Sequence, residues 1–445
     1  MTPTLSRNRH PVPLSGALLV AACLSLSACS SDDDAGANDI PAETPEVPDT
    51  TGAPDPLDGT RYAFVSGSTP VTFDAGQIER FELRTATGDT EDAELALEVV
   101  STGTTVATGS DIRVATDERD LYQIGRFQID SLTRYAPDDL DAPIWQYSVN
   151  GTETAANPYE VVFASETKAY VIRYGSPLVW IVDPSSSTEA NFKIGEIDLS
   201  AYDTVDGVPN ASDAILVNGR LFVLLQRLDE FAPVRDGYVA VIDTATDTEV
   251  DTGMGSDGLF GIALESSNPA TLSYVEENEE IYVVGRGNIF GNADVAGDPY
   301  DGGVEVIDPV SFERDLLLDD GTAEDNDGFV ADALVVSPDK GYVLYYTEFG
   351  VTTLRTFNPM TGLPAEDAVA GLENRDISVL AQDPDGRLWV GLSVGADGTE
   401  SPGFTVLDPR DDSVLIERVA TEFNPNDIVF VDVPAESGTN SVEAN

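Results

Sequence analysis

Short runs in which apolar and polar residues alternate fill the chain between residues 61 and 434. The apolar positions lie two apart, as in Ile112 and Val114 or Ile377 and Val379. This period is that of a strand with one buried face, whereas a helix would place its apolar residues three and four apart. Polar turns rich in Asp, Gly and Pro separate the runs. The pattern therefore predicts an all-β domain and excludes a helical repeat.

The strands recur in a repeat of about fifty residues. Each copy has an alternating strand, a polar turn, a second strand rich in aromatic and β-branched residues, and a third strand that ends in a signature such as "VIDT" or "VLDP". About four short strands in fifty residues is the size of a β-propeller blade. Aligned on the residue that opens the first strand, the copies begin at Asp111, Glu160, Asp213, Gly261, Asp332, Asp376 and Asp427.

The two ends of the repeat region complement each other. "NDIVFVDV" at 426–433 is a first strand with nothing after it, while 61–68, 79–83 and 94–100 read as second, third and fourth strands with nothing before them. Joining them completes one blade and removes an exposed sheet edge. The sequence thus predicts a seven-bladed β-propeller over residues 61–435, closed by a C-terminal inner strand that pairs with the N-terminal blade.

Two segments resemble a known group of repeats. "VVSPDKGYVLYY" at 335–346 and "YVAVIDTATDTEV" at 238–250 are similar to the units of YVTN-repeat seven-bladed propellers. The resemblance implies the same fold over most of the chain. It does not imply an activity, because the repeated residues are scaffold and this fold carries both binding proteins and enzymes.

The N-terminal residues are typical of a lipoprotein. Arg7 and Arg9 precede an apolar run at 14–26 that is too short to cross a bilayer permanently, which indicates a cleavable signal peptide over 1–28. "LSAC" at 26–29 resembles the lipobox, which implies that Cys29 is lipidated and becomes the first residue of the mature chain. A secreted protein with an incidental Cys29 is the alternative.

Residues 29–60 and 436–445 are predicted to be a disordered acidic, Pro-rich tether and a disordered tail, because few of their residues can be buried. A lipid on Cys29 would attach the protein to a membrane. Ser30 follows the cysteine where an Asp resembles an inner-membrane retention signal, so we expect the outer membrane. The acidic run 32–34 resembles surface-export tags, and both the periplasmic and the cell-surface side stay open.

Charge and composition exclude several classes of function. Residues 1–28 hold two of the 23 basic residues and none of the 80 acidic ones, so the mature chain is strongly acidic and nucleic acid is not an expected partner. The only histidine, His10, and the only other cysteine, Cys23, lie in the signal peptide. Catalysis through Ser-His-Asp or Cys-His, zinc sites with His or Cys ligands, and disulfides are therefore not expected.

Acidic residues open most of the predicted inner strands and would form a ring at one mouth of the central channel. Such a ring could attract a cation or a cationic ligand. The alternative is structural: each carboxylate accepts backbone N–H bonds from a neighbouring blade. The six residues are Asp111, Glu160, Asp213, Asp332, Asp376 and Asp427.

Two Asp-rich segments with interspersed glycines, 294–303 and 319–329, have the composition of calcium loops. Ala323 breaks the spacing that an EF-hand loop requires. We therefore predict solvated acidic loops, no metal site and no cofactor, with Ca²⁺ as the weaker alternative.

Two loops, 227–237 and 286–303, are longer than a propeller needs and lie between second and third strands. Long loops on one face commonly carry binding residues. We predict a ligand-binding surface with Phe231, Phe290 and Tyr300 as anchors and Arg227, Arg235 and Arg286 as polar groups. In the alternative, the aromatic residues cover blade ends and the arginines pair with Asp229, Asp236 and Asp294 to hold the loops.

These features favour a non-catalytic lipoprotein that binds a small ligand or an outer-membrane protein partner. The architecture is similar to that of surface corrinoid-capturing propeller lipoproteins, which implies nutrient capture beside a TonB-dependent transporter. A carboxylate-based enzyme, such as a glycosidase or lactonase, is the first alternative, since two carboxylates suffice for glycoside hydrolysis. A structural scaffold of the envelope is the second, and a flat aromatic patch outside the mouth would favour it.

Overall fold

The computed structural model describes residues 59–434 apart from 71, 87–95, 293–294, 297 and 395–400. The predicted signal peptide, Cys29, the tether up to residue 58 and the C-terminal tail lie outside the described residues. Gly59 and Thr60, placed at the end of the tether by the sequence, belong to the first strand. No helix among the described residues is long and apolar enough to cross a membrane.

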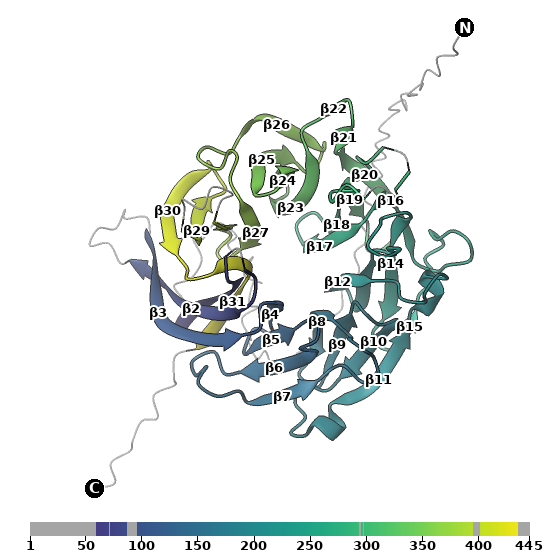
Figure 1. The fold of residues 1–445 in the computed structure, drawn as a ribbon, viewed down its shortest axis with the longest axis horizontal. Coiled ribbons are helices and arrows are strands. Elements are labelled where there is room, and N and C mark those ends of the chain that lie inside the picture. Colours follow the sequence, from purple (N-terminus) through teal and green to yellow (C-terminus); the bar gives the residue numbers. More distant parts are fainter. Residues whose placement is uncertain are drawn as a thin grey trace, which may run out of the picture. The chain divides into compact units, whose positions relative to one another are not determined.

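Seven sheets surround a common axis and form the blades of a propeller in the described part of the chain (Figure 1). From the inner to the outer strand, blade one contains β31 (Asn424–Pro434), β1 (Gly59–Ser68), β2 (Gly76–Ala86) and β3 (Ala96–Thr108); blade two contains β4 (Ile112–Thr116), β5 (Leu121–Gly125), β6 (Ser131–Tyr135) and β7 (Trp145–Ser148); and blade three contains β8 (Pro158–Ser165), β9 (Lys168–Arg173), β10 (Leu178–Val182) and β11 (Lys193–Asp198).

The remaining blades follow the same order. Blade four contains β12 (Ala211–Val217), β13 (Arg220–Leu225), β14 (Asp236–Asp243) and β15 (Thr248–Glu249); blade five contains β17 (Pro269–Val275), β18 (Glu280–Gly285), β19 (Gly303–Ile307) and β20 (Arg314–Asp319); blade six contains β23 (Phe329–Ser337), β24 (Lys340–Glu348), β25 (Val351–Asn358) and β26 (Leu363–Ala368); and blade seven contains β27 (Ile377–Gln382), β28 (Leu388–Leu392), β29 (Gly403–Asp408) and β30 (Ser413–Ala420). Two short 3₁₀ turns, Glu189–Asn191 and Ser200–Tyr202, lie in connections.

The C-terminal strand closes the ring as predicted. β31 pairs antiparallel with β1, so that Tyr62 lies opposite Val431 and Ala63 lies opposite Phe430. Ile428 and Val431 are buried against neighbouring blades. Both ends of the described chain thus contribute to one sheet, which leaves no gap between the first and last blades.

The start of blade five differs from the prediction. The strand that begins after Gly261 is β16 (Ile262–Ser267), which pairs with β14 of the preceding blade, and the inner strand of blade five is β17. β15 is only two residues long, so most of the outer edge of β14 is free to pair with β16. Both segments alternate in the same way, and the sequence alone therefore favoured the wrong one.

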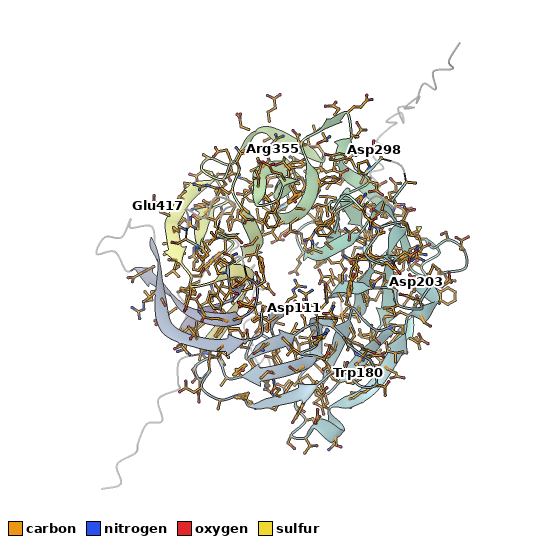
Figure 2. The ribbon with its side chains drawn as sticks, viewed as in Figure 1. Asp111, Trp180, Asp203, Asp298, Arg355 and Glu417 are labelled. Atoms are coloured by element: carbon orange, nitrogen blue, oxygen red, sulfur yellow. The ribbon has the colours of Figure 1, made fainter. Side chains whose placement is uncertain are left out.

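The hydrophobic core lies between the blades. Side chains of adjacent sheets interdigitate around the ring (Figure 2), and Phe81 of blade one meets Phe404 of blade seven edge-on, with ring centroids 5.1 Å apart. Some residues of the repeat form ion pairs between neighbouring blades. Nζ of Lys168 lies 2.7 Å from the carboxylate of Asp247, and Nζ of Lys340 lies 2.7 Å from that of Asp412. These two lysines therefore have a structural role between blades.

Strands alternate in direction, so two kinds of connection share one face of the propeller. They are the loops from second to third strands and the links from one blade to the next. We call this the loop face. The two long loops of the sequence analysis and the starts of all the inner strands lie on it.

Candidate functional site on the loop face

One register position recurs at the start of each inner strand, and we call it the mouth position. In each blade it is the inner-strand residue of the last regular pair between the inner and second strands. Glu160, which pairs with Ile172, and Asp213, which pairs with Leu224, are examples. Around the ring from blade one to blade seven, this position holds Asp427, Arg113, Glu160, Asp213, Thr271, Asp332 and Val379.

The predicted ring of six carboxylates is therefore reduced to four. Asp111 and Asp376 lie just before their inner strands, where their carbonyl oxygens accept N–H bonds from Arg126 and Ser393. Asn157, Asn210 and Asn268 make the same bond in blades three, four and five. Alignment of the repeat copies placed Asp111 and Asp376 wrongly at the mouth position. In blade two the reason is that β4 lacks the bulge that the acidic inner strands contain, and in blade seven it is that no acid occupies the mouth position.

Three of the four carboxylates connect neighbouring blades. Asp213 accepts N–H bonds from Ala214 at 2.9 Å and, across the blade boundary, from Leu272 at 2.7 Å. Asp427 accepts the N–H of Val114 in blade two at 3.3 Å. Thr271 donates its hydroxyl to Asp332 at 3.1 Å. These contacts match the structural alternative weighed for the acidic ring.

Arg113 is the cation at the centre of these acids. Its guanidinium lies 3.5 Å from Asp427 and 3.7 Å from Glu160. Burial alone would lower the pKa of Arg113, but the surrounding carboxylates raise it above its ordinary value. Burial raises the pKa of Glu160 and that of Asp213, against the opposing effect of Arg113. The mouth is thus a cluster of mixed charge and not a simple acidic funnel.

Arg286 brings a second guanidinium to the mouth. It follows β18 and donates Nε to the carbonyl of Ala331 at 2.6 Å, next to Asp332. Among the described residues, no hydrogen bond involves its Nη atoms. Burial lowers the pKa of Arg286, but arginine keeps its charge in proteins. The Nη atoms therefore remain available to a carboxylate or phosphate.

Arg126 lies at the equivalent point of blade two and was not identified from the sequence. Its guanidinium lies 3.8 Å from the ring centroid of Tyr159, which in turn stacks on Tyr174 at 4.4 Å. Asp111, which lies near the propeller axis in Figure 2, pairs with Arg126 at 3.2 Å. A Gly-Arg pair ends the second strand in both "QIGR" and "VVGR", and this shared signal could have identified Arg126.

The other two predicted arginines hold their own loop. Arg235 pairs with the buried carboxylate of Asp203 at 2.7 Å. Arg227 donates to the carbonyl oxygens of Tyr202 and Asp236 and lies over the ring of Tyr238. Both arginines therefore hold the loop, as in the alternative given in the sequence analysis. Their partners, however, are the carboxylate of Asp203 and backbone oxygens.

The predicted aromatic anchors divide into two kinds. Tyr300 is covered by Phe329, with the rings parallel and 4.3 Å apart. Phe231 and Phe290, in contrast, are exposed to solvent. In the part of the chain that the structure describes, three further loops between second and third strands also carry an exposed phenylalanine, so that five of the seven blades present one on the loop face. These side chains are 52% to 83% exposed and belong to Phe73, Phe127, Phe231, Phe290 and Phe349.

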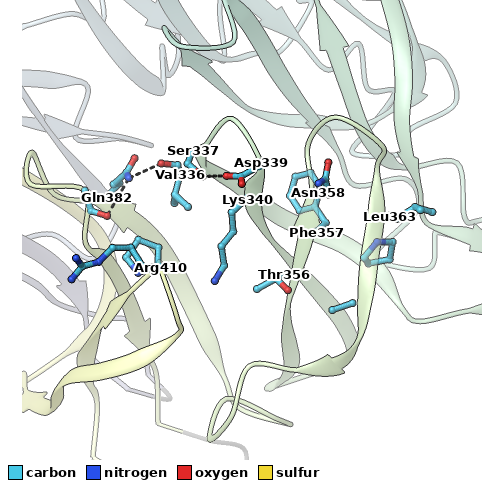
Figure 3. A pocket seen from close by; sticks show the side chains of 14 residues that line it. Val336, Ser337, Asp339, Lys340, Thr356, Phe357, Asn358, Leu363, Gln382 and Arg410 are labelled. Carbon is cyan, nitrogen blue, oxygen red and sulfur yellow. Dashed lines mark hydrogen bonds between the residues drawn. The ribbon is translucent and has the colours of Figure 1, made fainter. Parts of the chain in front are cut away.

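A cavity lies on the face opposite the loop face, between the hairpins of blades six and seven. Its volume is about 730 Å³, and Lys340, Phe357, Gln382 and Arg410 are among the residues that line it (Figure 3). Its two cations are already engaged: Lys340 with Asp412, and Arg410 with Asp408. We therefore place the candidate site on the loop face.

Comparison with known proteins supports the fold and goes no further. No family model matches the chain, and no curated protein matches it either. A solved protein from Lactobacillus plantarum is 12% identical, with a TM-score of 0.51 over 84% of this chain and 99% of that one. Kuenenia stuttgartiensis hydrazine synthase is 14% identical, with a TM-score of 0.47 over 72% and 94%. At this level of identity the similarity to the Lactobacillus plantarum protein concerns the propeller fold alone.

Proposed function

We propose that this protein is an outer-membrane lipoprotein, anchored through Cys29 and exposed at the cell surface, that binds a protein partner through the loop face. The ring of five exposed phenylalanines supports this proposal most strongly. Single exposed apolar residues are ordinary on protein surfaces, but a set gathered on one face is typical of an interaction site.

The chemistry of the face favours a protein over a lipid surface. Aromatic side chains are enriched where proteins bind one another, because they bury a large area at low entropic cost. The strong negative charge of the chain would repel an anionic membrane. The partner we propose is an outer-membrane protein with an apolar surface and basic residues around it, of which a TonB-dependent transporter is the expected class.

A small anionic ligand is the second candidate, and it would bind at the mouth. Arg286 supports it with its free Nη atoms, and the stack of Arg126 on Tyr159 offers a flat surface beside them. A carboxylate- or phosphate-bearing nutrient fits these groups. Loss of its binding in Arg286→Ala but not in Phe290→Ala would separate this mode from partner binding.

The partner can be identified by photocrosslinking in cells. A photoreactive amino acid in place of Phe290 is expected to give a defined crosslinked product with one envelope protein. The control replaces Met360, which is equally exposed but lies on the opposite face. Crosslinking of the same protein from both positions, or from Met360 alone, would argue against the loop face.

Lipidation of Cys29 is tested separately. Growth with an alkyne fatty acid, followed by click labelling, is expected to mark the wild-type protein and to leave Cys29→Ser unlabelled, because the thiol is the proposed acceptor of the lipid. The variant should also remain uncleaved. Equal labelling of both proteins would remove the anchor from the proposal without affecting the loop face.

A further inference from the structure

The mouth of the propeller combines both signs of charge, with the negative sign in excess. Arg113 is the cation among the residues at mouth positions, and Arg286 adds a second guanidinium from the end of β18. Arg126 adds no excess charge, because it pairs with Asp111 at 3.2 Å. Four carboxylates face these two guanidiniums. They belong to Asp427, Glu160, Asp213 and Asp332.

These groups come from different blades but act on one another across the mouth, which the inner strands surround (Figure 1). Burial lowers the pKa of Arg286, Asp332 of blade six raises it, and the like charge of Arg113 in blade two lowers it further. Burial also raises the pKa of Asp213 in blade four, and Arg113 opposes this effect. Electrostatic effects of this kind require short separations. One small molecule at the mouth would therefore lie within reach of several of these groups.

Two charged side chains at the mouth have polar atoms without a partner. Within the described chain, neither Nη atom of Arg286 makes a hydrogen bond. Asp332 accepts the N–H of Ala333 at 3.0 Å and the hydroxyl of Thr271 at 3.1 Å, and both bonds go to Oδ1. Its other oxygen, Oδ2, has no hydrogen bond to any residue that the structure describes.

Arg286 and Asp332 are also neighbours that do not pair with each other. Nε of Arg286 bonds to the carbonyl oxygen of Ala331, the residue before Asp332, and each of the two charges affects the pKa of the other. No ion pair joins them in the described ranges. Both side chains are partly buried, where an unpaired charge is costly. A molecule with a negative group for Nη and a positive group for Oδ2 would satisfy both.

We infer that the mouth binds a small zwitterion of the amino-acid type, with its carboxylate on Arg286 and its ammonium group on Asp332. The inference deepens the second candidate of the proposed function, a small ligand at the mouth, and rests on it. A guanidinium can hold a carboxylate through two parallel bonds, and an ammonium group donates three. The surrounding carboxylates disfavour phosphate, because its additional negative charge would be repelled.

The excess of negative charge selects among amino acids. Oε1 of Glu160 accepts the N–H of Val161 at 2.8 Å, whereas its Oε2 lies 3.7 Å from the guanidinium of Arg113, too far for a hydrogen bond. This oxygen is an acceptor for a cationic side chain. Arginine and lysine are therefore expected to bind more tightly than neutral amino acids, and acidic ones to bind most weakly.

Isothermal titration calorimetry of the full-length protein tests the inference, with L-arginine and L-lysine as probes. Agmatine is arginine without its carboxylate, and Nα-acetyl-arginine lacks the charge on the α-amino group. Each is expected to bind roughly 10- to 100-fold more weakly than arginine, because each loses one charge-assisted contact.

Two variants assign these contacts to the side chains. Arg286→Gln should weaken the binding of arginine by roughly 10- to 100-fold and leave agmatine unchanged, since agmatine has no carboxylate. Asp332→Asn should weaken arginine similarly and leave Nα-acetyl-arginine unchanged. A purely structural effect would weaken all three ligands alike. Arg286→Lys is the second variant, should Arg286→Gln fail to fold. Arg84→Gln, which changes an exposed arginine of β2, is the matched control and should bind arginine like the wild type.

The inference is wrong if the wild type binds neither arginine nor lysine, or if it binds arginine, agmatine and Nα-acetyl-arginine equally. Succinate and inorganic phosphate separate this failure from that of the proposed function. If either anion binds, loses affinity in Arg286→Gln, and no amino acid binds, the mouth holds an anion and not a zwitterion. Crosslinking through Phe290 is measured independently, so none of these results decides whether a protein partner binds the loop face.

Discussion

A chain that ends after Glu422 is expected to unfold or to melt far below the full-length protein. The truncation deletes β31, which pairs with β1 along its whole length. It also removes the buried side chains of Ile428 and Val431, at roughly 1.5 to 3 kcal/mol each. The bidentate bond from Arg61 to Asp432, at 2.5 and 2.8 Å, is lost as well. Domains are stable by only about 5 to 15 kcal/mol, so this loss is a large part of the total.

The control is a chain that ends after Pro434, which keeps β31 complete and should melt like the full-length protein. Circular dichroism during heating measures both. If the chain that ends after Glu422 melts at the wild-type temperature, the strand does not close the ring.

Substitution of Arg113 with leucine is expected to cost about 2 kcal/mol of folding free energy at pH 8, because Asp427 and Glu160 lose the cation between them. Removing one partner of a buried pair costs about 3 to 5 kcal/mol, and the partial exposure of these side chains reduces the effect. The folded-state pKa of Glu160 is raised, so the folded state binds more protons than the unfolded state. Ionisation of Glu160 therefore lowers the stability of the folded protein as the pH rises from the ordinary pKa of Glu160 towards its raised value of about 8. Arg113 opposes this effect only where Glu160 is ionised, so the cost of Arg113→Leu should be smaller at pH 5.

Urea unfolding at both pH values measures this difference. Arg84→Leu is the matched control: Arg84 is exposed and pairs with Glu82 of the same strand, so no measurable change in stability is expected at either pH. A loss for Arg113→Leu that is equal at pH 5 and pH 8 would mean that the ionisation of Glu160 does not depend on this arginine.

The fold was predictable because the repeat is carried by many residues at once. Alternation, turns and the "VIDT" type of ending recur in nearly every copy, so the blade count and the ring closure followed from the sequence. Blade five was the exception, since β16 and β17 alternate alike and only the short β15 decides which of them pairs with β14. That choice depends on contacts between blades, which a local pattern does not contain.

The candidate site was predictable only in part, for two physical reasons. A β-bulge shifts the register by one residue, so the first acid of a copy is not always at the mouth position, and Arg113 replaced Asp111 there. Loop length identified Phe231 and Phe290 but not Phe73, Phe127 or Phe349, which lie in shorter connections. An exposed phenylalanine in a short turn was a usable signal that length alone did not reveal.

The most direct test of the loop face is the affinity of the purified protein for the crosslinked partner, by surface plasmon resonance. We expect that changing Phe231, Phe290 and Phe349 together to serine weakens binding at least about 100-fold, since buried aromatic anchors each contribute about 1 to 2 kcal/mol or more. The Tm should stay unchanged because all three side chains are exposed. The control changes Val310 and Met360, exposed on the opposite face, and should bind like the wild type. Wild-type affinity in the triple variant, or an equal loss in the control, would contradict binding of the partner through the loop face.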